Sequence, residues 1–421
     1  MVEQIEPGVL AEASDSASQP DAAGGLQEVS TRWRVAIGVG ALMAFSIKVF
    51  ISLKTYGTND AYFWRLFLSF LKTNGPTALY RDAGLFIHPP FMIHVLRCWG
   101  WLESTTGLSL QFWVRLPSIL ADVASLLLTF KLLQRMNKAT PAVLLLLALA
   151  PASVMISGFH GNTDPVMICF VLLAIYLIET GHSPWLAGFA CGMSLNIKAA
   201  AIVFPLCFVL YLPDLRKRLQ LVGGALLTIV IGSLPYIAQD PVLIASRMGA
   251  YRSIYGQWGL SRFVEMMETS LPWLNMAFRN WGRFGVLAVI LAAAFWMSRL
   301  KPKPPLFLQC GLVAFLFLTV TPGFGVQYLS WLVPFAALEL GTAALFYSTS
   351  AVFLFVIYNF WAGGLPWYFA DSTPKGPWSK TPMGLETEII CWFSVLMVCL
   401  ICFHRVRSLS VQDSSPQVAS A

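Results

Sequence analysis

Apolar runs about as long as a helix that crosses a bilayer recur along this chain, and they restrict its fold more than any other feature. The first runs from about Trp33 to Leu53, near the ~20 residues with which an α-helix crosses the hydrocarbon core. Charged residues make up only 12% of the sequence, whereas about a quarter of an ordinary soluble domain is charged. Because backbone polar groups in lipid must bond within their own segment, these runs predict an all-α, polytopic transmembrane bundle. We expect about twelve spans, at 33–53, 112–134, 139–157, 164–180, 184–196, 199–213, 219–238, 284–298, 305–320, 327–343, 345–362 and 389–403.

The distribution of charge predicts three regions. Residues 1–31 contain six acids and no Lys or Arg, a composition that cannot bury a core and predicts a disordered acidic tail. Residues 32–404 form the expected membrane domain, and residues 405–421 form a second tail. The net charge of +7 suits anionic membrane lipids and phosphate ligands. We expect such partners and no nucleic acid.

Basic segments indicate which side of the membrane each loop faces. The parity of the spans brings 214–218, 298–303 and 404–407 to the side of both tails, and the positive-inside rule makes that side the cytoplasm. All the candidate chemical groups then face the other compartment. They lie in the loops 54–111, 157–164, 239–283 and 321–327 and at the break around Lys198.

The opening loop, 54–111, is expected to carry two helices at the membrane surface. Thr58 and Asn59 are good N-cap residues, so Asp60 falls in the first turn, where free N–H groups favour a carboxylate. The helix that follows has an apolar face and a polar stripe, which is typical of an interfacial helix. A second apolar helix, about 89–103, is too short to cross and is expected to be a surface or re-entrant helix. The apolar face is Phe63, Trp64, Phe67, Leu68 and Leu71, and the polar stripe is Arg65, Ser69 and Lys72.

Two further groups of polar residues stand at the expected outer side. His160 and Asp164 are four residues apart and could form a ligand pair or an acid–base pair, although a hydrogen bond that stabilises the turn is the commoner use. Lys198 lies between two apolar half-spans, where a cation needs either a phosphate or an acid such as Asp164. The sequence contains no Walker loop, GxGxxG or DxD motif and no metal-ligand spacing. We therefore expect neither a metal nor another cofactor.

Several of these elements resemble the GT-C superfamily of membrane glycosyltransferases, which includes protein O-mannosyltransferases and lipid A aminoarabinose transferases. The likeness rests on an acid just after the first span, a His-Pro-Pro, and an Arg-Leu-Pro-Ser that opens the next span. It extends over most of residues 33–345. The matching stretches are Asp60, His88-Pro89-Pro90, Arg115-Leu116-Pro117-Ser118, Lys198 in SLNIKAAAIVFPL, and PGFGVQYLSWLVP from Pro322 to Pro334.

The resemblance implies a hexosyltransferase that uses a polyprenyl-phosphate sugar, with mannose as the first choice. The sugar would pass with inversion to a lipid-linked, glycan or protein acceptor on the extracytoplasmic face of a bacterial inner membrane or, alternatively, of the endoplasmic reticulum. Asp60 matches the general base. The expected residues for substrate and phosphate are Lys198, Arg252, His88, Arg115, His160, Asp164 and Gln327.

Two other functions use similar elements. A transporter or a flippase of lipid-linked precursors would require a pair of broken helices related by a repeat, and only the break at 196–199 is evident. An acyl- or phosphotransferase would need a metal cluster or an intramembrane histidine. Only His94 approaches lipid depth. The one-sided placement of acid, cations and long loops favours the glycosyltransferase.

Overall fold

The computed structural model describes residues 30–249, 253–362 and 383–412, and helices dominate them. The first half contains α1 (Thr31–Lys54), α2 (Asn59–Asp82), α3 (Phe91–Thr106), α4 (Leu110–Arg135), α5 (Pro141–Ala148), α6 (Pro151–Met155), the π-helical turn η1 (Ile156–His160), α7 (Asp164–Glu179), α8 (Pro184–Ile197), the 3₁₀ turn η2 (Ala199–Val203) and α9 (Pro205–Tyr211). The second half contains α10 (Leu215–Ile237), α11 (Pro241–Gly249), β1 (Ile254–Tyr255), α12 (Gly259–Met266), α13 (Pro272–Arg299), α14 (Leu306–Val320), β2 (Gly323–Phe324), the 3₁₀ turn η3 (Val326–Tyr328), α15 (Leu329–Ala336), α16 (Leu340–Ala362) and α17 (Gly384–Gln412). The predicted all-α class is therefore confirmed.

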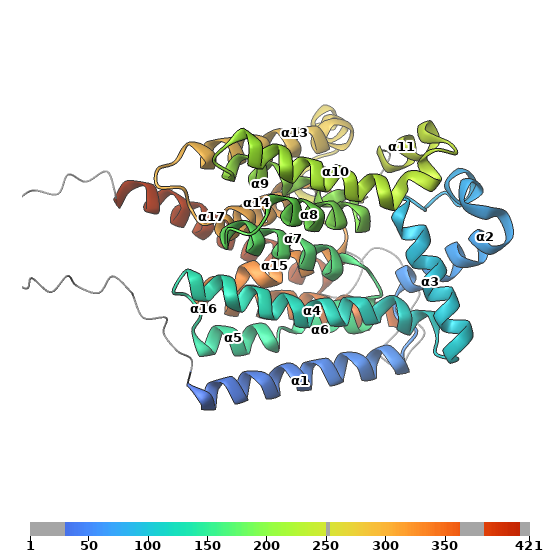
Figure 1. Ribbon diagram of the computed structural model, residues 1–421, viewed down its shortest axis with the longest axis horizontal. Helices are drawn as coiled ribbons and strands as arrows, with labels where there is room; N and C mark the ends of the chain where they lie inside the picture. Colours follow the sequence, from blue (N-terminus) through green and yellow to red (C-terminus); the bar gives the residue numbers. More distant parts are fainter. Residues whose placement is uncertain (1–29, 250–252, 363–382, 413–421) are drawn as a thin grey trace, which may run out of the picture.

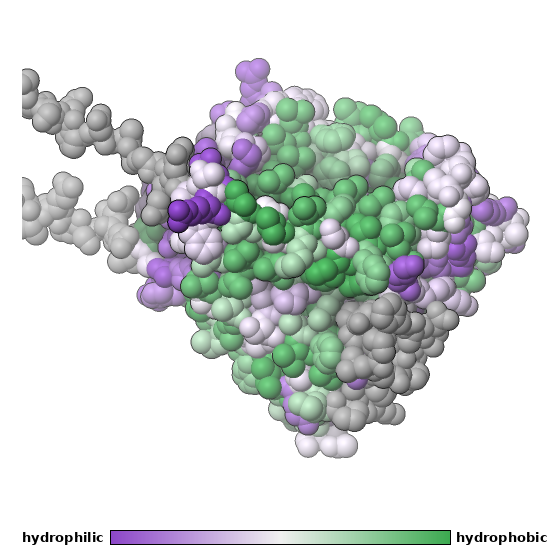
Figure 2. All heavy atoms as spheres, turned by 90° about the horizontal axis from the view of Figure 1, so that it is seen from below, coloured by the Kyte–Doolittle hydropathy of each residue, from purple (hydrophilic) through white to green (hydrophobic). Residues whose placement is uncertain are grey.

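The long helices run side by side along one axis and form a bundle. α2, α3 and α11 lie at one end of it, and both described chain ends, at the start of α1 and the end of α17, lie at the other (Figure 1). On one face, apolar residues cover the middle of the bundle and hydrophilic residues gather toward the two ends (Figure 2). This pattern is typical of a protein whose middle zone is surrounded by lipid.

Seven helical segments among the described residues are long and apolar enough to cross a membrane. They are Thr31–Lys54, Leu110–Arg135, Pro141–His160, Leu215–Ile237, Pro272–Arg299, Leu340–Asn359 and Gly384–Leu409. The expected count of twelve is not confirmed. The other predicted runs form helices that are too short to span by themselves: α7 has 16 residues, α8 has 14 and α14 has 15, against the ~20 that a crossing needs.

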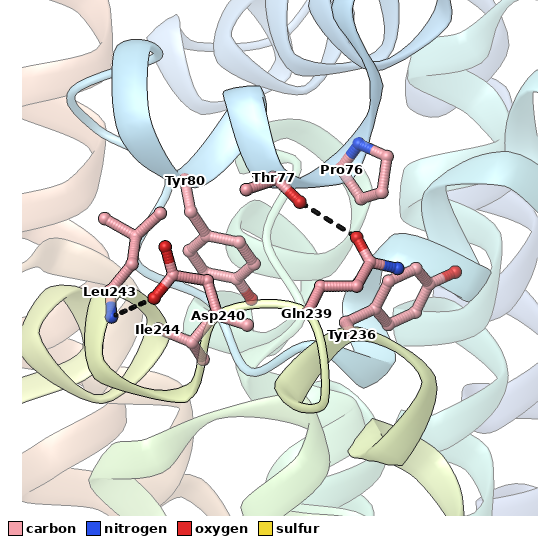
Figure 3. Close-up of a pocket in the computed structure, with 8 residues that line it drawn as sticks. All are labelled: Pro76, Thr77, Tyr80, Tyr236, Gln239, Asp240, Leu243 and Ile244. Carbon is pink, nitrogen blue, oxygen red and sulfur yellow. Dashed lines mark hydrogen bonds between the residues drawn. The ribbon is translucent and has the colours of Figure 1, made fainter.

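The second half of α2 ties the end of the bundle to the junction of α10 and α11. Gly75 has φ 81° and precedes Pro76, so α2 bends there. After the bend, Thr77 donates a hydrogen bond of 2.8 Å to the side-chain oxygen of Gln239. Figure 3 shows this contact and, beside it, the aromatic rings of Tyr80 and Tyr236 on opposite sides of the junction. Arg247 of α11 adds a bond of 2.6 Å to the carbonyl of Arg81.

Two loops that are far apart in sequence also meet. Ile254 and Tyr255 of β1 pair antiparallel with Phe324 and Gly323 of β2. The indole ring of Trp258 stacks on the ring of Phe324 with centroids 4.0 Å apart. The segments 239–283 and 321–327 are thus in contact. The parity of the predicted spans had assigned both to the same side of the membrane.

Candidate active site

Asp60 is placed by a tight contact between the start of α2 and the turn η1. Thr58 is the N-cap of α2: its hydroxyl accepts from the N–H of Asp60 at 3.4 Å and donates to the carbonyl of His160 at 2.7 Å. Gly57 has φ 97°, and a Cβ there would lie 2.7 Å from the carbonyl oxygen of Phe159. Only glycine allows both this conformation and this approach. The predicted cap and the position of Asp60 in the first turn are confirmed.

The Asp60 carboxylate meets two side chains that follow η1. Its Oδ2 lies 3.2 Å from Nε2 of His160, which has no other partner among the described residues. The side-chain amide of Asn162 donates to the same oxygen. Asn162 is itself oriented, because its Oδ1 accepts from the N–H of Thr163 at 2.6 Å. The side chain of Asp60 is 24% exposed and that of His160 only 3%, so the carboxylate is partly exposed while the imidazole is buried.

These neighbours keep the Asp60 carboxylate ionised. Burial raises the pKa of this group, but the charge and hydrogen bond of His160, the hydrogen bond of Asn162 and the charge of Lys198 together hold the pKa below its ordinary value. At neutral pH Asp60 is therefore a charged proton acceptor with an exposed side.

The other ring nitrogen of His160 connects the site to a distant helix. Its Nδ1 lies 3.0 Å from the hydroxyl of Tyr358 in α16 and 3.5 Å from the hydroxyl of Thr58. Tyr358 is buried. The imidazole is thereby held between a phenol on one side and the Asp60 carboxylate on the other, which fixes the plane of its ring.

Lys198 and Asp164 form a separate buried pair. Lys198 breaks the helical path between α8 and η2, with φ −152° and ψ 121°, and its ammonium donates to Oδ2 of Asp164 at 2.6 Å. The indole of Trp331 donates to Oδ1 of the same carboxylate, and the ammonium lies 5.0 Å from the ring centroid of Tyr328. The pairing that the sequence suggested for Lys198 is present. His160 is the last residue of η1 and Asp164 the first of α7, and each bonds to different partners rather than to the other.

Arg115, a candidate for phosphate binding, uses its guanidinium to hold the chain around Asp60. Its five N–H groups donate to the carbonyls of Gln111, Tyr56 and Gly158 and to both the hydroxyl and the carbonyl of Thr55, at 2.7 to 3.0 Å. An arginine has five such groups, so all are engaged, and the residue is fully buried. These contacts give Arg115 a positioning role.

His88 lies between α2 and α3. Its ring is 4.5 Å from that of Trp64, and its carbonyl accepts from the hydroxyl of Tyr80 at 2.7 Å. Burial, with the charge of Lys198, lowers the pKa of His88 to about 3 against the opposing effect of Asp60. His88 is therefore neutral at physiological pH.

The remaining candidates differ in position. Gln327 is half-buried in η3, and its carbonyl accepts from the hydroxyl of Ser330 at 2.7 Å. Arg252 lies outside the described residues. Among the residues that are described, no three His, Cys, Asp or Glu side chains are grouped as a metal site requires.

Three residues of this site were missed from the sequence. Asn162 could have been found, since it is a polar residue in the same turn as His160. Tyr358 and Trp331 come from apolar runs more than 160 residues away, where a phenol or an indole is ordinarily a packing residue. Their role depends on how the helices pack.

Comparison with known families gives one result. The model of glycosyltransferase family 87 matches residues 86–322, which is more than half of the 421 residues. The match includes His88, His160, Asp164 and Lys198, and it begins after Asp60. No curated protein matches the sequence.

Proposed function

This chain belongs to glycosyltransferase family 87, and from that membership we propose that it moves a hexose from a polyprenyl-phosphate donor to an acceptor hydroxyl, with Asp60 as the general base. Mannose is the proposed sugar, and a lipid-linked, glycan or protein hydroxyl is the proposed acceptor. The observation that carries the proposal is an ionised, partly exposed carboxylate held by His160 and Asn162 at one end of a membrane bundle.

The reaction needs one proton acceptor and one site for a leaving phosphate. The acceptor hydroxyl gives its proton to Asp60 while its oxygen forms a bond to the anomeric carbon. The bond from that carbon to the phosphate oxygen breaks on the opposite face of the sugar, so the configuration inverts. The polyprenyl phosphate leaves with the electron pair of that bond. A base must come within about 2.6 to 3.2 Å of the hydroxyl, and the exposed side of Asp60 allows that approach.

The neighbours of Asp60 support this role because they fix the carboxylate without covering it. His160 and Asn162 both approach Oδ2, and Thr58 fixes the start of the helix through His160. A catalytic group must be held near its productive geometry before the substrate arrives, and preorganisation of this kind is a large part of catalysis.

Lys198 and one arginine of the segment 247–283 are the proposed contacts of the leaving phosphate. The charge of Lys198 lowers the pKa of Asp60, and its ammonium pairs with Asp164. In the same segment, Arg247 bonds to the carbonyl of Arg81 and Arg283 to the carbonyl of Gly249. Arg262 pairs with Glu388, and the guanidinium of Arg279 lies over the ring of Tyr255. Arg252 is our choice for the second cation.

A lipid-borne donor fits the position of the site. We propose that the end of the bundle bearing α2 and α3 faces the extracytoplasmic side, most simply the outer side of a bacterial inner membrane, with about twelve crossings, both termini in the cytoplasm and α2 and α3 in the membrane surface. Soluble nucleotide sugars are generally not supplied there. A donor that arrives through the bilayer needs one or two cations for its single phosphate.

The test uses purified full-length protein in detergent with synthetic polyprenyl-phosphate hexoses. One arm replaces the lipid donor with nucleotide sugars, a second adds a chelator, and a third uses Asp60→Asn. We expect turnover of the lipid donor with and without chelator and none with Asp60→Asn. Turnover of nucleotide sugars alone, or complete loss with the chelator, would contradict the proposed donor and mechanism.

A further inference from the structure

We propose that a hollow between α2 and α3 binds the phosphate of an anionic phospholipid head group, at a place separate from the Asp60 site. We call it the α2–α3 pocket. Its volume is about 420 Å³, within the ~300 to 1,000 Å³ of small-ligand sites. Leu68 and Leu71 of α2 line its apolar side, and Lys72 and Arg97 provide two cations.

The two helices that form the pocket are in firm contact. Gly100 of α3 lies against Leu68, and a Cβ at this glycine would be 2.8 Å from a methyl carbon of the leucine. A larger residue would push the helices apart. The side chains of Lys72, Arg97, Trp101 and Ser104 stand around this contact, so the hollow has defined walls.

The charge of the pocket is positive. Neither aspartate nor glutamate is among its lining residues. The nearby Glu103 is already engaged, because it accepts two bonds from Arg65, at 2.8 and 2.5 Å, and one from the N–H of Leu110, at 2.8 Å. Arg65 balances the charge of Glu103. Lys72 and Arg97 therefore leave about two positive charges for a ligand.

Arg97 is held in place by the bundle. Its Nη1 donates to the hydroxyl of Tyr236 at 3.2 Å, and its guanidinium carbon lies 5.8 Å from the ring centroid. Tyr236 belongs to α10 and also lines the junction with α2 (Figure 3). His94, one turn before Arg97, adds no charge at neutral pH, because burial and then the charge of Arg97 lower its pKa. The contact with Tyr236 uses one of the five N–H groups of Arg97.

The surroundings of the pocket favour a lipid over a free anion. Trp101, one of its lining residues, is 62% exposed, and Tyr62 and Leu66, outside the pocket on α2, are 47% and 41% exposed. Exposed aromatic and apolar side chains next to cations are typical of the zone where head groups meet acyl chains. The leucines on one side of the pocket would contact the start of an acyl chain while the cations hold the phosphate.

The pocket is too far from Asp60 to hold the phosphate of the sugar that is transferred. Lys72 follows Asp60 by twelve residues on α2, about 18 Å at 1.5 Å per residue. The base must touch the acceptor hydroxyl that attacks the anomeric carbon. A phosphate directly bonded to that carbon cannot reach Lys72 and Arg97, so this site goes beyond the proposed reaction.

Native mass spectrometry of the full-length protein with added phosphatidylglycerol or phosphatidylcholine tests the proposal. The variant carries Lys72→Gln and Arg97→Gln, and the matched control carries Lys217→Gln and Arg299→Gln, which remove two exposed cations elsewhere. At ~1 kcal/mol for each cation, the pocket variant should bind phosphatidylglycerol roughly 30-fold more weakly at its tightest site. The control should bind like the unmodified protein.

Further arms separate the possible sources of the phosphate and guard against misfolding. Inorganic phosphate at the same concentration should not displace phosphatidylglycerol, and displacement would overturn the assignment to a lipid. Lys72→Gln alone, at an exposed position, provides a mild variant if the double variant unfolds, and it should lose part of the affinity. Asp60→Asn should bind the lipid normally. Equal binding by the pocket variant and the control, or equal binding of the two lipids, would overturn the proposal whatever the enzyme transfers.

Discussion

Asp60 contacts the turn between η1 and α7, and Asp164 follows that turn. The surroundings of the two carboxylates differ and indicate different roles. Asp60 is 24% exposed and meets an imidazole and an amide at a single oxygen. Asp164 is completely buried, with a lysine on one oxygen and an indole on the other. The first carboxylate can still accept a proton from a substrate. The second has both oxygens engaged and serves to hold Lys198.

The same comparison explains why a charge is tolerated at each place. Asp60 begins a helix, where free N–H groups favour a carboxylate, and it retains access to solvent. Asp164 also begins a helix, α7, but it is completely buried and depends on its lysine, because an unpaired buried charge is costly. A substitution at the first site should therefore change the chemistry, and one at the second should also change the stability.

The largest effect on transfer is expected from Asp60→Asn. The amide keeps the shape of the carboxylate but cannot accept the proton, and loss of a general base costs about 10²- to 10⁴-fold. The measurement is turnover of the lipid-linked donor at saturating concentrations. Asp82→Asn, which changes the last residue of the same helix, is the control and should remain active. An Asp60→Asn protein with more than about a tenth of the original rate would remove the distinction between the two carboxylates.

Lys198→Ala should produce the largest loss of stability. It leaves Asp164 buried without its cation, and breaking a buried pair from one side costs about 3 to 5 kcal/mol. Lys198→Arg keeps the charge and should keep most of the stability and part of the donor use. Thermal unfolding in detergent measures the first effect, and the KM for the donor measures the second. If Lys198→Ala melts like the unmodified protein, the pair does not stabilise the fold.

The local features of both carboxylate sites could be predicted from the sequence. The contacts between residues that are distant in the sequence could not. Thr58 as a helix cap and the break at Lys198 depend on neighbouring residues, and the structure has both. The approach of His160 to Asp60 joins residues 100 positions apart. Such contacts depend on the packing of whole helices.

The number of membrane spans was difficult to predict for a related reason. Hydropathy detects apolar residues but not the places where a helix stops. The run at 139–157 is interrupted before Pro151, so it contains α5, α6 and part of η1, since proline has no N–H to continue the preceding helix. The run at 327–343 similarly contains a 3₁₀ turn and two helices. Apolar length alone therefore predicts where apolar runs lie, but not which of them form one unbroken helix.

His160→Gln should have a smaller effect on transfer than Asp60→Asn and should change the pH dependence. Without the imidazole, burial still raises the pKa of Asp60 while two of the influences that lower it are gone. The carboxylate is active when ionised, so the acid limb of the pH–rate profile should move to higher pH. A hydrogen bond to a charged group is worth ~1.5 to 3 kcal/mol, which corresponds to about 10- to 150-fold in rate. A lower rate with an unmoved acid limb would indicate that His160 acts only on the fold.

The smallest of these effects is expected from Tyr358→Phe, which tests how far the support of Asp60 extends. The hydroxyl of Tyr358 lies 3.0 Å from Nδ1 of His160, and its ring packs near the imidazole with centroids 5.8 Å apart. The phenylalanine keeps the ring and removes only the hydrogen bond, worth ~0.5 to 1.5 kcal/mol, so the rate should fall by about two- to tenfold.

The double variant Tyr358→Phe with His160→Gln distinguishes support through the imidazole from a separate effect. If Tyr358 acts on Asp60 only through His160, its removal should cost little once the histidine has been replaced, and the two losses should not add. Tyr347→Phe is the matched control, because that hydroxyl donates to the carbonyl of Val333 in the same helix bundle. It should leave the pH profile unchanged. Fully additive losses for Tyr358 and His160 would show that Tyr358 acts on the rate independently of His160.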